Sequence, residues 1–493
     1  MNLFIRIRSL SAALLLSVCL GSGFSVAVAA ETYDIVLAGG RVMDPATGLD
    51  ATRHLGISGH RIEAVSEQPL EGIQIIDLNG LVVTPGFVDY HAHGQDNQAN
   101  RLQARDGVTT ALDLEGGRYP VESWYRERSG NAVLNYGVSV SHHGIRKALW
   151  PEAEEPERWA YAEAGPNELG QILARFRDGL SQGGIGAGLG LEYTPGAGYD
   201  EVWSIFDLMA EHRLPVTVHV RRARGEWNPP HSNLASIQEV LANAAGTGAA
   251  LHIVHITPSA LADTAIALAL IDGARAAGVD VTTEAYPYTA GSTSLRSAAF
   301  DSGWQQRLGM SYGDLVWTET GERLTRETFE RYRAPDYPAE TTAVIAHFIP
   351  EEAMHLAISH PAAHIASDGL SWKTGGEHPR GAGTFARVLG HHVRERQSLD
   401  LMTALAKMSW LPAQRLAPFV PAMADKGRIA AGADADLTVF DPERVIDRAT
   451  YTQPMQASAG ITHVLVGGTF VVRDGHHVDG VFPGRALRGT GAP

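Results

Sequence analysis

The sequence has 493 residues, of which 44% are hydrophobic and 19% are charged, enough for one large α/β domain and a smaller second unit. Its 40 basic and 55 acidic residues give a net charge of −15, which argues against nucleic acid or an anionic membrane surface as the main partner. The single cysteine, Cys19, excludes an internal disulfide and a zinc–thiolate cluster, so any metal ligands must be His, Asp or Glu.

The N-terminus has the pattern of a secretory signal peptide. Arg6 and Arg8 precede the apolar run 10–20, and small residues follow at 27–30. This run is too short for a stable membrane span, and a cleavage site after small residues fits the pattern. We therefore expect residues 1–30 to be removed and the mature chain to be periplasmic or secreted. No other segment has the apolar length that a membrane span requires.

Both ends of the mature chain are rich in short β-like runs. Alternating apolar residues and turn signals occur in residues 31–85, for example "YDIVLAGGRVMD", and return in residues 426–493, for example "ITHVLVGGTFVVRDG". The sequence predicts that the two ends meet and build one small β-sandwich.

The middle of the chain, residues 86–425, alternates short apolar runs with helical patterns. Eight runs have a polar residue at or next to their last position: 86–93, 108–115, 134–143, 185–193, 216–220, 250–255, 281–286 and 363–368. This alternation predicts an α/β fold, a closed (β/α)8 barrel of the TIM type, whose active site lies at the C-terminal ends of its strands. Residues near 295–340 fit no unit and are expected to form an insertion over the barrel mouth.

The polar residues at the ends of these runs form a set of potential metal ligands. They are His91, His93, Glu115, His142, His143, His219, His252, His255 and Asp368. His91 and His93 are two residues apart on an extended segment, so both imidazoles face one side and can reach one cation. His252 and His255 face opposite ways on one strand, and His255 is preferred because it is nearer the C-terminal end. His142 and His143 are weaker candidates, since histidines often serve outside metal sites.

These residues resemble those of the amidohydrolase superfamily, which has HxH after the first strand, single histidines on strands five and six, and an aspartate on strand eight. More specifically, "YPYTAGSTSL" at 286–295, "HPRGAGTFARVLG" at 378–390 and "GADADLTVFDPERVIDRATYTQP" at 432–454 resemble the N-acyl-D-amino-acid deacylases. The resemblance covers about residues 33–475, and the "HPRGAGTFARVLG" block is its most specific part.

The resemblance implies a divalent metal, zinc, with one or two ions. His91 and His93 would belong to one metal position, His219 and His255 to the other, and Asp368 would be the metal-proximal acid/base. The family's bridging cysteine is missing here, and Glu115 at nearly the same point is favoured as its replacement over Glu192. A carbamylated lysine, which related amidohydrolases use, is excluded because no lysine occurs between Lys147 and Lys373.

The resemblance also implies a small-molecule substrate, an N-acyl-D-amino acid, whose amide bond would be hydrolysed to a D-amino acid and a carboxylate. Arg380 matches the family's carboxylate-binding arginine, and Tyr286 and Ser292 match positions that contact the same carboxylate. Tyr193 is a further candidate for contact with the substrate. Where the family has a lysine two residues after the strand-six histidine, this chain has Thr257. The alternatives are a cyclic amidase of the dihydroorotase or hydantoinase kind, a dipeptidase on the same scaffold, and a metal-binding protein without catalysis.

Overall fold

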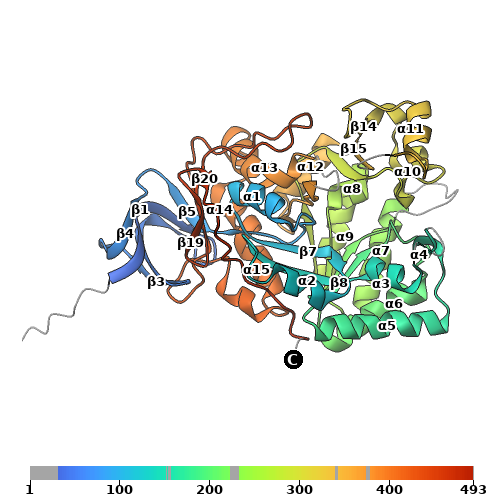
Figure 1. Ribbon diagram of the computed structural model, residues 1–493, viewed down its shortest axis with the longest axis horizontal. Coiled ribbons are helices and arrows are strands. Elements are labelled where there is room, and N and C mark those ends of the chain that lie inside the picture. Colours follow the sequence, from blue (N-terminus) through green and yellow to red (C-terminus); the bar gives the residue numbers. More distant parts are fainter. Residues whose placement is uncertain are drawn as a thin grey trace, which may run out of the picture.

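The computed structural model describes residues 32–151, 153, 157–221, 232–338, 342–372 and 378–491. A sheet made from both chain ends lies at one end of the molecule, and a barrel with its surrounding helices forms the rest (Figure 1). The signal peptide expected at residues 1–30 lies outside the described residues.

The terminal sheet joins strands from the two ends of the chain. In sequence order its strands are β1 (Thr32–Asp44), β2 (Leu49–Ser58), β3 (Arg61–Ser66), β4 (Glu71–Asp77), β5 (Val82–Pro85), β17 (Leu437–Phe440), β18 (Ile461–Val466), β19 (Thr469–Arg473) and β20 (His476–His477). The junction is β5, which pairs in parallel with β1 and antiparallel with β17. Val42, Leu55, Ile57, Leu437 and Leu465 belong to one apolar core that both ends share.

The barrel sheet contains all eight strands that the sequence predicts, which confirms the predicted fold class. They are β6 (Phe87–Asp89), β7 (Val108–Arg118), β8 (Asn135–Ser141), β9 (Ala187–Gly190), β10 (Val216–His219), β11 (Leu251–Ile253), β12 (Val281–Ala285) and β16 (Ala363–Ile365). Neighbouring strands are parallel. An isolated parallel bridge between Ala92 and Gly369 joins the segments that follow the first and last strands.

Helices cover the outside of the barrel (Figure 1). They include α1 (Asn97–Arg105), α2 (Val121–Arg128), α3 (His142–Leu149), α4 (Arg158–Tyr161), α5 (Pro166–Ser181), α6 (Tyr199–His212), α7 (Ser232–Thr247), α8 (Ile256–Ala260), α9 (Thr264–Ala276), α12 (Glu351–Ser359), α13 (Arg380–Arg387), α14 (Leu401–Leu405) and α15 (Leu411–Leu416). Within the described ranges, only the stretch 256–276 is long and apolar enough to cross a membrane, and half of it is buried inside the protein. Its helices pack on α7, α12 and β12, which is the packing of a barrel helix.

The segment between the seventh and eighth barrel strands forms a small unit over the barrel. It contains a three-stranded antiparallel sheet of β13 (Ala290–Ser294), β14 (Leu315–Trp317) and β15 (Ala343–His347), together with α10 (Trp304–Leu308) and α11 (Arg326–Arg333). Phe300, Trp304, Trp317 and Phe329 belong to its own apolar core. The insertion expected near 295–340 therefore extends at both ends by one strand of this sheet.

The predicted third strand is too long at its C-terminal end. Strand β8 stops at Ser141, and His142 and His143 are the first two residues of α3. Ser141 ends the strand because its hydroxyl accepts a hydrogen bond from the Gly144 N–H at 3.1 Å and so caps the helix. His142 is bound to Glu201 of α6 at 2.6 Å, so it cannot serve at the barrel mouth.

Candidate metal centre

The C-terminal ends of the barrel strands bring the predicted ligands together. His91 and His93 follow β6, and their Nε2 atoms lie 3.1 Å apart. His91 is buried, while His93 is 20% exposed on its side chain. Both imidazoles thus present the same nitrogen to one point, as the HxH spacing predicts.

Two buried carboxylates hold the other nitrogen of each imidazole. Asp113, on β7, contacts His93 Nδ1 at 3.0 Å and is itself held by Arg118 at 2.6 Å. Glu284, on β12, contacts His91 Nδ1, and its other oxygen contacts His252 Nε2 at 3.0 Å. When Nδ1 carries the proton, Nε2 is left with its lone pair for a metal ion. These contacts therefore prepare both histidines to act as ligands.

Glu115 and Asp368 complete the group around the HxH pair. Glu115 Oε2 lies 3.5 Å from His93 Nε2. Asp368 Oδ1 lies 3.3 Å from His91 Nε2 and 3.5 Å from His93 Nε2. Two overlapping triads have ligand atoms within 4.8 Å of one another, namely His91, His93, Glu115 and His91, His255, Asp368. A set of imidazoles and carboxylates at such separations fits a zinc-like divalent cation.

His219 and His255 form the second half of the centre. His255 Nε2 lies 3.1 Å from His219 Nδ1, and the ring centroid of His255 is 5.4 Å from that of His91. Glu192 contacts the other nitrogen of His219, Nε2, at 2.8 Å. Glu192 therefore sits behind His219 and belongs to neither triad, whereas Glu115 belongs to one. Of these two carboxylates, Glu115 is therefore the one whose oxygen lies among the potential ligand atoms.

Two of these residues adopt a backbone conformation that non-glycine residues rarely use. His255 has φ of 27° and Asp368 has φ of 52°. Such strained residues persist only where the surrounding structure holds them, and they cluster at functional sites. The Glu284 carboxylate contributes to this hold, because it accepts a hydrogen bond from the His255 N–H at 3.3 Å.

The charges in the centre are set by burial and by close partners. Burial disfavours the charge of Asp368, but Arg380 and then His91 outweigh it and hold the pKa of this carboxyl well below its usual range. Burial, followed by the neighbouring His219, lowers the pKa of His255 well below its usual value. Asp368 is therefore an ionised acceptor and His255 a neutral imidazole, which are the forms that bind a cation.

Arg380 connects the centre to a cavity lined by the residues expected to contact substrate. Its Nη1 lies 2.8 Å from Asp368 Oδ2, its Nη2 donates to the Ser292 carbonyl at 3.3 Å, and its guanidinium lies 4.9 Å from the Tyr286 ring centroid. The cavity is lined by Tyr193, His219, His255, Tyr286, Ser292, Asp368 and Arg380, with Phe300, Leu308 and Phe348 on its apolar side. The structure thus brings Tyr193, Tyr286, Ser292 and Arg380 to one cavity beside the ligands.

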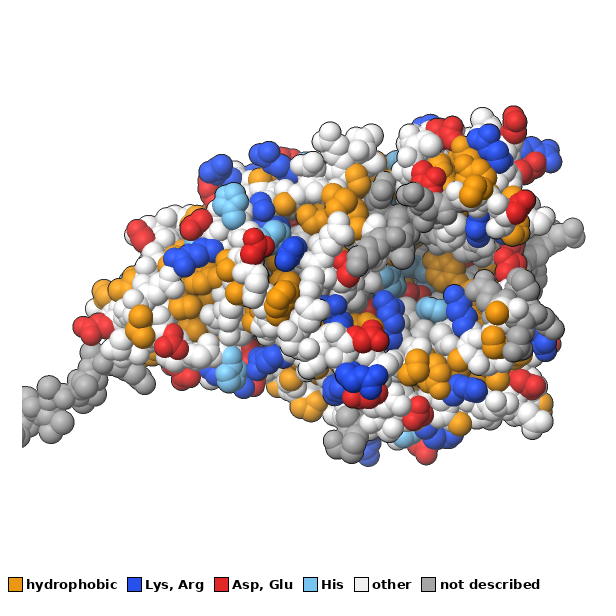
Figure 2. Space-filling model, viewed as in Figure 1, with side chains coloured by type: hydrophobic (Ala, Val, Ile, Leu, Met, Phe, Trp, Pro, Cys, Tyr) orange, Lys and Arg blue, Asp and Glu red, His pale blue; other side chains and the backbone are white. Residues whose placement is uncertain are grey.

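A wider cleft of about 910 Å³ lies between the insertion and the helices α3 and α4. It shares Tyr193 and Thr293 with the inner cavity, so it continues that cavity outward. Figure 2 shows the surface hollowed beneath the insertion, with His, Lys or Arg and hydrophobic side chains in its walls. His143 and Lys147 line this cleft, which places His143 in the outer cleft and outside both ligand triads.

Sequence reasoning missed Asp113 and Glu284. Both are acidic residues within predicted strands, and neither is the last polar residue of its run. A search for every acidic residue near a strand end would have found them. Their roles depend on partners that are 20 and 193 residues away in sequence, which no local pattern reveals.

Comparison with known proteins shows which family the chain resembles over most of its length. A model of the amidohydrolase family matches residues 74–168 and 125–472. An N-acyl-D-glutamate deacylase of Alcaligenes xylosoxydans xylosoxydans is 30% identical, over 90% of this chain and 94% of that protein. A D-aminoacylase of the same organism is 29% identical, over 94% and 99%. The crystal structure of N-acyl-D-glutamate deacylase from Bordetella bronchiseptica, complexed with zinc and a phosphonate inhibitor, is 26% identical with a TM-score of 0.78, covering 93% of this chain and 100% of that one.

Proposed function

Because the chain belongs to the amidohydrolase family, we propose that it is a metal-dependent hydrolase that cleaves the amide bond of N-acyl-D-amino acids. Its products would be a D-amino acid and a carboxylate. The observation that carries this proposal is that Asp368 belongs to a ligand triad and also lines the cavity that holds Arg380. The similar proteins named above are deacylases of acylated D-amino acids.

The ligands proposed for the metal are His91, His93, Glu115, His219, His255 and Asp368. Zinc, as one or two ions, suits this set because imidazole and carboxylate are both accepted zinc ligands. When bound, the ion polarises the amide carbonyl and lowers the pKa of a water molecule toward about 7. Asp113 and Glu284 keep the HxH imidazoles in the required tautomer.

Asp368 is the proposed general base and then general acid. It lies at the metal ligands and at the cavity, so one carboxylate can take a proton from the attacking water and give it to the leaving nitrogen. Its low pKa favours the acceptor form before the reaction starts. Among the described residues, His143 lines the outer cleft and belongs to neither ligand triad, which supports Asp368 over His143 for this role.

Arg380 is the proposed partner of the substrate carboxylate. An arginine can hold a carboxylate by two parallel hydrogen bonds, and Arg380 Nε has no hydrogen-bond partner among the described residues. Ser292 and Tyr286 lie beside the guanidinium and Tyr193 lies against His219, with ring centroids 4.9 Å apart. The apolar side of the cavity would then receive the side chain of the amino acid.

The direct test is a substrate panel on the purified protein. We expect hydrolysis of N-acetyl-D-amino acids over their L forms, loss of activity after chelation, and recovery on adding zinc. Faster turnover of a hydantoin or of dihydroorotate would support the cyclic-amidase alternative. Preference for dipeptides with L residues would support the dipeptidase alternative. Stoichiometric zinc without hydrolysis of any substrate would support a metal-binding protein without catalysis.

We further propose that the mature enzyme is exported to the periplasm or secreted. The support is the signal-peptide pattern in residues 1–30. Mass spectrometry of protein recovered from the exported fraction should show a start near Glu31. Active, folded protein that retains Met1 would contradict this proposal.

A further inference from the structure

A second pocket, of about 390 Å³, lies beside the barrel mouth and shares no residue with the cavity at the metal ligands. Two short segments of the chain separate the pocket from the cavity, and each segment contributes different residues to the two spaces. Tyr286 and Arg380 line the cavity at the metal ligands, whereas Tyr288 and Pro379 line the second pocket. This pocket is therefore adjacent to the proposed active site but distinct from it.

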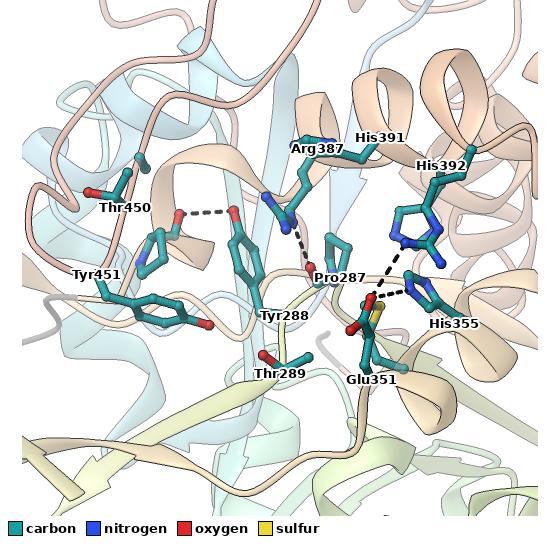
Figure 3. Close-up of a pocket in the computed structure, with 14 residues that line it drawn as sticks. Pro287, Tyr288, Thr289, Glu351, His355, Arg387, His391, His392, Thr450 and Tyr451 are labelled. Carbon is teal, nitrogen blue, oxygen red and sulfur yellow. Dashed lines mark hydrogen bonds and ion pairs between the residues drawn. The ribbon is translucent and has the colours of Figure 1, made fainter. Parts of the chain in front are cut away.

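Basic side chains dominate the pocket lining. They are His355 of α12 together with Arg387, His391, His392 and Arg396, and Glu351 is the one acidic residue that lines it. Figure 3 shows Arg387 above Pro287 and Tyr288, and His355 and Glu351 on another side. Thr450 and Tyr451 lie on the far side of Tyr288 from His355, and Thr289 lies below Tyr288 (Figure 3). The pocket thus offers two arginine guanidiniums, three imidazoles and an edge of hydroxyl groups.

A rare helical form arranges most of these basic residues. The segment Val388–Glu395 is a π-helix of eight residues, with Arg387 before it and Arg396 after it. The hydrogen bonds of a π-helix run from residue i to i+5 instead of i+4, so it has more residues per turn than an α-helix, and such turns occur frequently at functional sites. The basic residues of this segment follow one another at intervals of four or five: Arg387, then His391 or His392, then Arg396. The wide helix therefore places them on one face. An ordinary α-helix would spread this series around its axis.

The guanidinium of Arg387 is fixed and retains a free donor. Its Nε donates to the Pro287 carbonyl at 2.8 Å, its Nη1 contacts Asp447 at 3.0 Å, and it lies 5.0 Å from the Tyr288 ring centroid. Its Nη2 makes no hydrogen bond to another described residue. A donor held rigidly at the edge of a pocket loses little entropy on binding a ligand.

Two carboxylates beside the pocket, Glu351 and Asp447, are each shared by two basic side chains. Glu351 accepts from His355 Nε2 at 3.0 Å and from Arg396 Nη1 at 3.4 Å, so one carboxylate is shared by two basic side chains. His391 is bound to Glu395 and Asp447. Burial, and then His355, Arg387 and Arg396, lower the pKa of His392 to about 3. These groups disfavour a further positive charge, which argues against a cation and for a negatively charged ligand.

We propose that this pocket is a second ligand site that binds a small oxyanion, either the carboxylate of an organic acid or phosphate. Arg387 and Arg396 would bind the charged oxygens, because arginine forms paired hydrogen bonds with both groups. The buried His392 and the hydroxyls of Thr450 and Tyr451 would contact the remaining polar atoms. The ligand would rest against Tyr288 and Pro379, which belong to the segments that carry Tyr286 and Arg380.

The test is calorimetric titration of the zinc-loaded full chain, in chloride buffer, with sodium phosphate and separately with sodium succinate. We expect saturable binding of at least one probe. The probe that binds more tightly shows whether the site prefers phosphate or the carboxylate of an organic acid. Arg396→Gln and Arg387→Gln should each weaken that binding at least tenfold. Arg396 is half exposed and makes one contact of 3.4 Å, so its replacement should not impair folding. Arg41→Gln, which removes a similarly exposed arginine from the terminal sheet, should leave binding unchanged.

Three results would overturn the proposal. One is the absence of binding by either probe. Another is binding that loses less than tenfold in both pocket variants, which would place the anion at the metal centre or elsewhere. The last is an equal loss in Arg41→Gln, which would indicate a general effect of net charge. Hydrolysis by the Arg396→Gln variant is measured alongside, so that a failure of the proposed enzymatic function is seen separately.

Discussion

Glu284 is expected to determine how tightly the enzyme holds its metal, although it is not itself a proposed ligand. Its carboxylate contacts His91 Nδ1 and His252 Nε2, and it accepts from the His255 N–H. The change Glu284→Gln keeps the size of the side chain but replaces one acceptor oxygen with an N–H group that faces a ring nitrogen. His91 would then lose the partner that fixes its tautomer.

The expected magnitude follows from these contacts. Loss of a partner that orients a metal-binding histidine typically costs about 10- to 100-fold in metal affinity. Because Glu284 is buried and paired with histidine, we also expect the free energy of unfolding to fall by about 3 kcal/mol. Metal affinity is measured by competition with a chelator, and stability by chemical denaturation of the metal-free chain.

Glu201→Gln is the matched control. Glu201 is also buried, and it binds His142 at 2.6 Å and Arg146 at 2.7 Å, away from the ligand triads. This variant should lose comparable stability and retain its metal affinity. If Glu284→Gln bound metal within twofold of the unmodified chain, or if Glu201→Gln lost as much affinity, Glu284 would not be orienting the ligands.

Four further predictions test the rest of the site and the fold. Asp368→Asn should lower turnover by about two to four orders of magnitude with a smaller loss of metal; a variant that keeps both would exclude Asp368 as the acid/base. Glu115→Ala should reduce metal content more than Glu192→Ala, as measured by elemental analysis, and the reverse order would move the ligand role to Glu192. Arg380→Ala should reduce kcat/KM for free-acid substrates more than for the matching carboxamides, and equal losses would make Arg380 structural. Burial lowers the pKa of Lys407 to about 7, so between about pH 7 and 10 only the unfolded chain keeps this proton. In denaturation experiments the free energy of unfolding should therefore rise with pH by up to about 1.4 kcal/mol per pH unit more than in the Lys407→Met variant. Parallel pH profiles of the two chains would show that Lys407 is protonated in the folded state.

The barrel could be predicted from the sequence because each strand is a short apolar run that ends in a polar residue. All eight runs appear in the sheet, yet several observed strands are shorter than their runs. Strand β11 covers Leu251–Ile253, for example, while His255 already is the N-cap of α8 and has a positive φ. The residue at which a strand ends depends on helix caps and on pairing with neighbouring strands. A hydrophobic pattern carries no information about either.

The positions of the candidate ligands could be predicted because a barrel gathers strand ends at one face. The contacts behind them could not, because they join side chains from distant strands across the barrel. Glu192 illustrates the difference: its place in the sequence suits a bridging ligand, but its carboxylate contacts the outer nitrogen of His219. The π-helix at Val388–Glu395 was not predicted from the sequence either.

The pairing of β5 with β17 has a consequence for the order in which the chain can fold during synthesis. Thr84 and Thr438 are partners in this pairing, so the ribosome must make roughly 350 further residues after Thr84 before its partner strand exists. The barrel strands can associate during that interval, since domains fold as their residues become available, but the terminal sheet cannot close. A nascent or truncated product that ends before Leu437 would expose the unpaired edge of β5, and such an edge is a template for association with other chains.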